Sequence, residues 1–298
     1  MKQLKKRNIS ADIIRSVAIF LVILFHLLYA IKPDNSFRYI GFVGLSLFFI
    51  VSGFILAENY PKLESFSLKW FFKRYIKISS LYYLALIFLV LLFGQQIYHG
   101  SLIKNLFYHF LFIDFISAET AYSIISPAWF LIPLMGLYLL FPYLNRLVKR
   151  FQWILLLVFI ATVLYRIKVG EFTDYSFFSP LFFIGEFCFG ISFSHKKNNP
   201  FLLFSILNIF VMPVMFLPYL IFYFIISINW EFVPYKLFAF FGANTFALFL
   251  FHESFIKLIL GKWHIYSLGK SSSLFLLGVI VIFCVWLSKK IQKIILKE

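Results

Sequence analysis

The chain has 298 residues, of which 62% are apolar and only 13% are charged, and its mean hydropathy is +0.91. Soluble domains contain about 45–50% apolar and about 25% charged residues, so a water-soluble globular fold is excluded. The formal net charge of +16 comes from basic residues in short loops between apolar stretches. No basic surface interleaved with aromatic residues is visible, and a nucleic-acid partner is therefore not expected.

The apolar residues form stretches that are long enough to cross ~30 Å of hydrocarbon as helices. Apolar runs such as 274–287 lack the alternation that a membrane β-barrel needs. The sequence therefore predicts an all-α, polytopic integral membrane protein that forms one domain over residues 1–298. Clear spans are expected at 12–31, 40–57, 76–93, 127–146, 152–169, 177–194, 236–257 and 272–288.

Two further stretches are assigned by the rule that cytoplasmic loops hold the excess of Lys and Arg. Residues 102–118 are short and contain charged side chains, and we treat them as a non-spanning outer segment. Residues 200–229 are split into two spans. The result is about ten transmembrane helices with both termini in the cytoplasm. The outer loops of this topology include Arg38, Arg166 and Lys257.

The first span contains two ionisable residues, Arg15 and His26, and such residues are functional candidates because they are costly in lipid. Eleven residues at about 100° each place both side chains within about 20° of one helix face, about 16 Å apart along the axis. We therefore expect both to face one cavity. A guanidinium binds phosphate, and a neutral imidazole takes a proton from a hydroxyl, which suits an acyl donor with phosphates. Alternatively, Arg15 reaches lipid headgroups and His26 bonds a nearby carbonyl.

Three segments carry a resemblance to a known family: ADIIRSVAIFLVILFH at 11–26, GFVGLSLFFIVSGFIL at 41–56 and FFKRYIKISSLYYL at 71–84. Their order and spacing resemble the membrane acyltransferase-3 family, integral-membrane O-acyltransferases of cell-surface glycans. In that family the first span carries Arg, ten residues and then His, which fall on Arg15 and His26. The second span carries a phenylalanine pair before Ser-Gly-Phe, which fall on Phe48, Phe49, Ser52, Gly53 and Phe54.

The resemblance extends over nearly the whole chain. The family's basic segment at the third span falls on Lys73, Arg74 and Lys77. The stretch FGANTFALFLFHESF at 241–255 is similar to a late span of the family, in which a small polar residue precedes a histidine. Those two positions are Asn244 and His252. The chain departs from the family at Ser80, where a proline is usual, at Phe130, where a serine is common, and at Leu134, where a glutamate is common.

The resemblance implies an acyltransferase of the cell membrane, surrounded by membrane lipids. It implies that acyl-CoA, most simply acetyl-CoA, is a co-substrate and not a permanently bound cofactor, and that the acceptor is a hydroxyl of a carbohydrate or lipid-linked sugar. It makes His26, with Arg15, the catalytic pair, and lets Arg15 bind the donor together with Lys73, Arg74 and Lys77. We assign to the channel or the acceptor site the residues Ser52, Gly53, Trp129, Glu186, Asn244, His252 and Glu253.

Other interpretations are open at this level. Gly53 can serve helix packing alone, His252 can be interfacial, and Glu186 can be either a protonated structural carboxyl or a partner of His26. The whole chain can instead be a transporter or a lipid or glycan flippase, with Arg15, His26 and Glu186 along its path. A non-catalytic scaffold is a third hypothesis. No histidine pair has metal-ligand spacing, and both cysteines lie in apolar stretches, so no metal site is expected.

Overall fold

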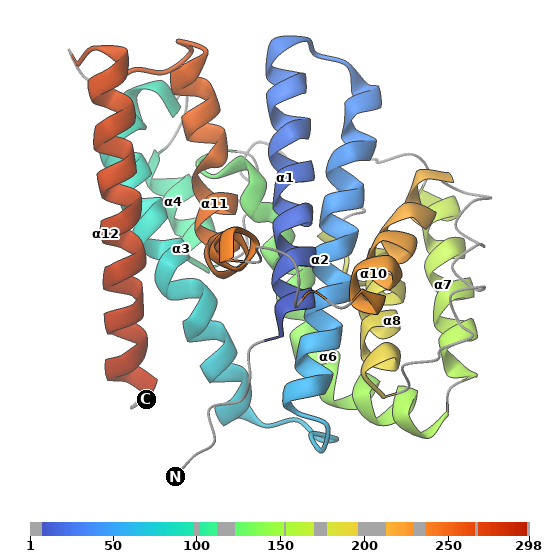
Figure 1. The fold of residues 1–298 in the computed structure, drawn as a ribbon. Coiled ribbons are helices and arrows are strands. Elements are labelled where there is room, and N and C mark those ends of the chain that lie inside the picture. The colour runs from blue at the N-terminus through green and yellow to red at the C-terminus, as the bar shows by residue number, and fades with distance from the viewer. Residues whose placement is uncertain are drawn as a thin grey trace.

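The computed structural model describes residues 8–97, 102–111, 123–151, 153–169, 178–195, 213–228, 230, 236–265 and 268–296, and this part of the chain is all-α (Figure 1). Its α-helices are α1 (Ile9–Ile31), α2 (Arg38–Asn59), α3 (Leu68–Ile97), α4 (Leu102–Leu111), α6 (Leu131–Arg150), α7 (Ile154–Val169), α8 (Ile184–His195), α10 (Leu217–Ser227), α11 (Lys236–Ile259) and α12 (Lys270–Leu296). Short 3-10 helices cover Asn35–Phe37, Ser126–Phe130, Pro180–Phe182 and Pro213–Phe216.

Six helical segments in the described residues are long and apolar enough to cross a membrane. They contain α1, α2, α3, α6, α11 and α12, and they confirm six of the predicted spans. The helices at the other predicted spans are shorter: α7 has 16 residues, α8 has 12 and α10 has 11. Of the predicted non-spanning segment 102–118, the structure describes the ten residues of α4, and they leave that prediction untested. Residues 112–118 and 200–212 lie outside the described residues.

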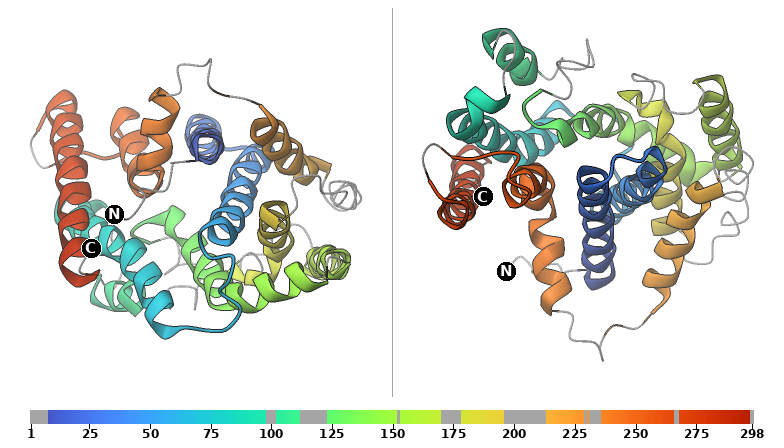
Figure 2. Two further views of the ribbon diagram at one scale, coloured as in Figure 1. Left: turned by 60° about the horizontal axis from the view of Figure 1, so that its bottom comes forward. Right: turned by 90° about the horizontal axis from the view of Figure 1, so that it is seen from above.

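A hairpin of α1 and α2 forms the centre of the molecule (Figure 1). The Asn8 side chain caps α1 by accepting a hydrogen bond from the Ala11 N–H at 3.0 Å. The Asp34 carboxylate accepts one from the Ser36 N–H at 2.8 Å in the short connection to α2. On one side of the hairpin lie α3, α11 and α12, and on the other lie α7, α8 and α10, a grouping that is also visible in the views of Figure 2.

Close contact between α2 and α8 depends on two glycines. A Cβ atom at Gly53 would lie 2.1 Å from the carbonyl oxygen of Phe187, and one at Gly190 would lie 2.0 Å from that of Ile50. Both distances are far below van der Waals contact with backbone atoms that cannot move aside, so any side chain would force the helices apart. Gly53 therefore serves helix packing, which is one of the two interpretations of its sequence context.

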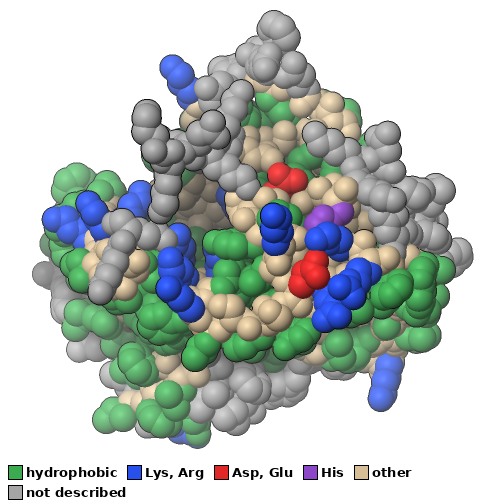
Figure 3. All heavy atoms as spheres, turned by 90° about the horizontal axis from the view of Figure 1, so that it is seen from below, with side chains coloured by type: hydrophobic (Ala, Val, Ile, Leu, Met, Phe, Trp, Pro, Cys, Tyr) green, Lys and Arg blue, Asp and Glu red, His purple; other side chains and the backbone are tan. Residues whose placement is uncertain are grey.

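The start of α1 and the end of α12 lie at the same end of the bundle, here called the lower end (Figure 1). Basic side chains gather on this face (Figure 3). At the same end, Lys149 of α6 donates to the Glu64 carboxylate at 2.8 Å in the connection between α2 and α3. This hydrogen bond holds the pKa of Glu64 below its ordinary value.

The helix α3 begins at Leu68, before the predicted start of its span at residue 76, so it includes Lys73 and Arg74 as well as Lys77. Two loop assignments of the predicted topology are wrong. Arg166 does not lie in an outer loop, because it is in α7 with its side chain only 1% exposed. Lys257 is likewise a residue of α11, where the Glu253 carboxylate one turn earlier pairs with it.

Candidate active site

A cavity of about 430 Å³ surrounds His26 near the upper end of α1, five residues before the helix ends. The side chains that line it come from α1, from the connection to α2 and α2 itself, from the 3-10 helix before α6, and from α11. They are Val22, Phe25, His26, Tyr29, Asn35, Arg38, Gly41, Phe42, Leu45, Ser126, Pro127, Trp129, Phe249 and Glu253. An apolar, aromatic wall with a few polar groups is typical of a small-molecule site.

The predicted residues Trp129 and Glu253 lie in the wall of this cavity together with His26. The Glu253 carboxylate accepts a hydrogen bond from Lys257 Nζ at 2.8 Å. The Lys257 ammonium also lies 4.3 Å from the centre of the Trp263 ring. The negative charge beside His26 is therefore balanced by a cation that is itself held in place on an aromatic face.

The His252 ring contacts the His26 ring. Their ring centroids are 4.8 Å apart, and the rings are inclined by 63°. The His252 side chain is buried, at 4% exposure, and its Nδ1 lies 2.8 Å from the carbonyl oxygen of Phe249. The sequence predicted His252 at this end of its span, and the structure brings it within ring contact of the proposed base.

A second group of predicted residues comes together nearer the lower end, around the hydroxyl of Tyr138. This hydroxyl is hydrogen-bonded to Ser52, and the charges of Arg74 and Arg15 both act on it. Arg15 also lies 3.4 Å from the Asp12 carboxylate, and its side chain is 33% exposed. The Arg74 guanidinium contacts the Tyr60 hydroxyl and lies 4.8 Å from the Tyr60 ring centre. Arg74 Nε is buried and has no hydrogen-bond partner among the described residues.

Glu186 and Asn244 bond to residues outside these two groups. Glu186 forms a 2.7 Å ion pair with Arg166, and the Ser46 hydroxyl lies 3.4 Å from the same Glu186 oxygen. The partner of Glu186 is therefore Arg166 and not His26. Asn244 donates to the Phe240 carbonyl of its own helix at 2.9 Å. Lys73 and Lys77 are half-buried on α3 on either side of Arg74.

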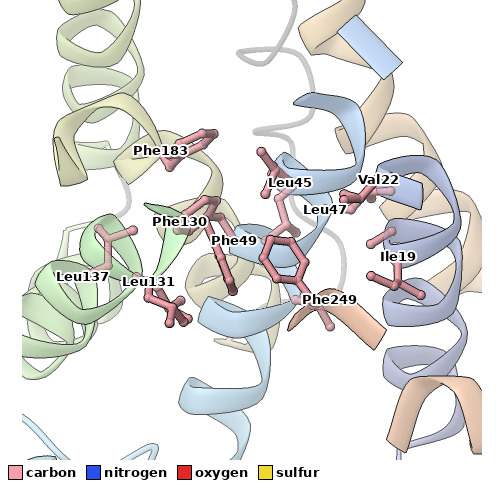
Figure 4. Packing of buried hydrophobic residues seen from close by; sticks show 14 of the residues in the cluster. Ile19, Val22, Leu45, Leu47, Phe49, Phe130, Leu131, Leu137, Phe183 and Phe249 are labelled. Atoms are coloured by element: carbon pink, nitrogen blue, oxygen red, sulfur yellow. The ribbon is translucent and has the colours of Figure 1, made fainter. Parts of the chain in front are cut away.

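The sequence predicts one cavity for Arg15 and His26, and Arg15 does not line the cavity at His26. An apolar layer lies between the two residues along α1. Between Arg15 and His26 on the same face of α1 lie Ile19 and Val22, both buried. They pack in one apolar cluster with Phe49 and Phe249 (Figure 4). The structure therefore contains two polar sites that are separated by packed side chains.

Two residues of these sites were missed by the sequence interpretation. Arg38 was interpreted only as a charge in an outer loop. The short connection between the first two spans was a signal that Arg38 lies at the same end of the bundle as His26. Tyr138 was used only to align its span with the family. Its position near Arg74 and Arg15 depends on how the helices pack, and the sequence gives no signal for it.

The fold and the site together define a multi-pass membrane protein with a histidine-lined cavity near one end and a pair of arginines nearer the other. Residues 8–289 match the sequence profile of the acyltransferase 3 family, described as an acyltransferase domain. Because this match covers almost the entire chain, the protein belongs to that family and is a membrane acyltransferase. Neither the curated proteins nor the solved structures contain a significant match to it. Family membership favours the enzyme over the transporter and scaffold hypotheses.

Proposed function

We propose that the protein is an O-acyltransferase that moves an acyl group, most simply acetyl, from acyl-CoA to a hydroxyl of a carbohydrate or lipid-linked sugar. The observation that carries this proposal is the position of His26 in the wall of a cavity that is large enough for a small molecule. The family supplies acyl transfer as the reaction class. The donor, the acceptor and the roles of individual residues are our inference.

The lower group of residues supports a phosphorylated donor. Arg15 and Arg74 lie near one hydroxyl, and Arg74 keeps a buried N–H without a partner in the described residues. Guanidinium groups bind phosphate through two parallel hydrogen bonds, so these arginines suit the phosphates of coenzyme A. We propose that Lys73 and Lys77, on the same helix as Arg74, add positive charge around them.

The separation of the two sites fits an extended donor. Arg15 and His26 are eleven residues apart on one helix, a rise of about 16 Å, which the pantetheine arm of coenzyme A can span. The arm would have to pass the apolar layer that contains Val22 and Phe249. We propose that these side chains move when the donor binds, so that the thioester reaches the cavity.

The proposed reaction needs one base. The unprotonated nitrogen of His26 takes the proton of the acceptor hydroxyl while the hydroxyl oxygen attacks the thioester carbonyl carbon. The new C–O bond forms, the C–S bond breaks, and the proton on His26 passes to the leaving sulfur. The products are the ester and coenzyme A with a free thiol, and no acyl-enzyme is required.

The cavity wall suits a sugar. Trp129 and Tyr29 offer aromatic faces, and Asn35, Arg38 and Glu253 offer polar groups that can bond hydroxyls. Phe130 and Leu134, which replace the common serine and glutamate, are both buried. Because these side chains are apolar, we propose that the acceptor differs from that of family members with the serine and glutamate at these positions.

We place the lower end in the cytoplasm, where acyl-CoA is made, and the protein in the cell membrane, as a single membrane domain. The basic residues on that end support this orientation. A cysteine introduced at Lys149 should then resist impermeant reagents in intact cells, and labelling from outside would overturn the assignment.

The test of the function is His26-dependent acetyl transfer by the purified protein. Radiolabelled acetyl-CoA is mixed with glycolipid extracts of the producing cells, and free thiol and base-labile label on the extract are measured. We expect the two to appear together with the wild-type protein and to be absent with His26→Ala. Thiol release that is equal in both proteins, or absent in both, would contradict the proposal.

A further inference from the structure

The two ring nitrogens of His252 have opposite surroundings. Nδ1 lies 2.8 Å from the carbonyl oxygen of Phe249 and 3.2 Å from that of Leu248, both in the preceding turn of α11. A carbonyl oxygen accepts hydrogen bonds and cannot donate them, so Nδ1 must carry the hydrogen. In the neutral ring the other nitrogen, Nε2, then holds a lone pair and is an acceptor.

That acceptor is buried without a partner. Nε2 of His252 has no hydrogen-bond partner among the described residues, although the side chain is almost wholly enclosed. Buried polar atoms are nearly always bonded, and an exception at a functional site indicates a group that is satisfied during the reaction.

The imidazole of His26 can supply a donor for Nε2 of His252. The rings of His26 and His252 are 4.8 Å apart between centroids, and an N–H···N hydrogen bond of about 3 Å between two imidazoles places their centroids roughly 5 Å apart. The separation of the two rings therefore permits this bond. Catalytic hydrogen bonds are often long or poorly aligned without substrate, and they shorten in the complex with substrate. The cationic Lys257 is not available for this contact, because it is held between Glu253 and the Trp263 ring.

We infer that His252 is a positioning residue whose Nε2 lone pair accepts the N–H of His26 and so turns the basic nitrogen of His26 toward the acceptor hydroxyl. This inference rests on the proposed function. The hydrogen bond selects one tautomer of His26 and stabilises the imidazolium that forms when His26 takes the proton. A neutral imidazole thereby does what a carboxylate does in the serine-hydrolase triad. His252 does not line the cavity, so it acts through His26 and not on the substrate.

Two isosteric substitutions separate the roles of the two nitrogens. In His252→Asn, the amide can reach the Nδ1 position and keep the bond to the Phe249 carbonyl, but nothing occupies the Nε2 position. In His252→Gln, the longer amide can place an oxygen acceptor near the Nε2 position. We expect His252→Asn to lower kcat by about 10²-fold with the KM for acetyl-CoA nearly unchanged, and His252→Gln to recover most of kcat.

Ser254→Ala is the matched control, because Ser254 is a buried polar residue of the same helix two positions away, and it should keep wild-type kcat. A His252→Asn protein with wild-type kcat would overturn the inference, and so would equal losses in folded Asn and Gln variants. Acetyl transfer that survives in His26→Ala would instead overturn the proposed function, so the two failures are distinguishable.

Should the variants not fold, nitrogen NMR of the ¹⁵N-histidine-labelled wild-type protein still tests the inference. Neutral His252 should show a protonated Nδ1 and an unprotonated Nε2. The opposite tautomer would overturn it.

Discussion

Two buried histidines of this protein differ in whether their hydrogen bonds are complete. His109, on α4, is bonded through Nδ1 to the Tyr82 hydroxyl at 2.9 Å and through Nε2 to the Ser123 hydroxyl at 3.0 Å. His252, on α11, is equally enclosed but bonded only through Nδ1 within the described residues. The His109 ring links α3, α4 and the segment before α6. The His252 ring instead leaves its Nε2 acceptor, beside His26, without a partner in the described residues. A completed polar site holds helices together, whereas an incomplete one is available for chemistry.

The arginines repeat this contrast. Arg166 donates to the Glu186 carboxylate at 2.7 Å and to the Phe182 carbonyl at 2.6 Å, and its side chain is buried. Arg74 contacts Tyr60 and keeps an N–H without a partner in the described chain. The contrast predicts that substitutions at Arg166 and His109 affect stability, and that substitutions at His252 and Arg74 affect the reaction.

The largest loss of stability is expected from breaking the Arg166 pair. Arg166→Met should lower the free energy of unfolding by about 3–5 kcal/mol, because it leaves the buried Glu186 carboxylate without its partner. Thermal unfolding in detergent measures the effect. The double variant with Glu186→Leu should recover most of the loss, since no buried charge remains. A double variant no more stable than Arg166→Met would show that the charge is not the cause.

A smaller loss of stability is expected at His109. His109→Ala removes two hydrogen bonds and leaves the Tyr82 hydroxyl buried without that partner, which should cost about 2–3 kcal/mol. The kcat per folded molecule should be unchanged, because nothing in the proposed reaction uses this ring. A tenfold fall in kcat without a change in melting temperature would move His109 from the scaffold to the mechanism.

The smallest effect is expected from Arg15→Lys. The ammonium keeps the charge but not the planar pair of donors, so the KM for acetyl-CoA should rise about tenfold while kcat stays near the wild-type value. Lys62→Ala is the control, since Lys62 is exposed in the connection between α2 and α3. An unchanged KM would assign Arg15 to the lipid headgroups.

The long spans could be predicted from the sequence because length and apolar composition alone determine whether a helix crosses the bilayer. The late start of α8 could not. The segment predicted at 177–194 is broken by Pro180, which begins a 3-10 helix, and α8 starts only at Ile184. A proline ends or begins helices locally, and its effect on the length of a span depends on the neighbouring packing.

The polar sites could be predicted only within one helix. The common face of Arg15 and His26 follows from helix geometry, but the apolar layer between them comes in part from α2 and α11. The pairing of Glu186 with Arg166 requires α7 and α8 to lie side by side, and no spacing in the sequence encodes that. The family resemblance selected His26 and His252, and the contact between their rings is a property of the fold.

The most direct test of the account separates donor binding from chemistry in His26→Ala. Calorimetry with a non-reactive thioether analogue of acetyl-CoA measures binding, and thiol release measures turnover. The exposed His264 gives the matched control, His264→Ala. We predict that His26→Ala binds the analogue with the wild-type Kd, because the phosphates are held about 16 Å away at Arg15, while turnover falls by at least ~10²-fold. Wild-type turnover in folded His26→Ala protein, or a loss of analogue binding that parallels the loss of turnover, would contradict the claim that His26 is the base.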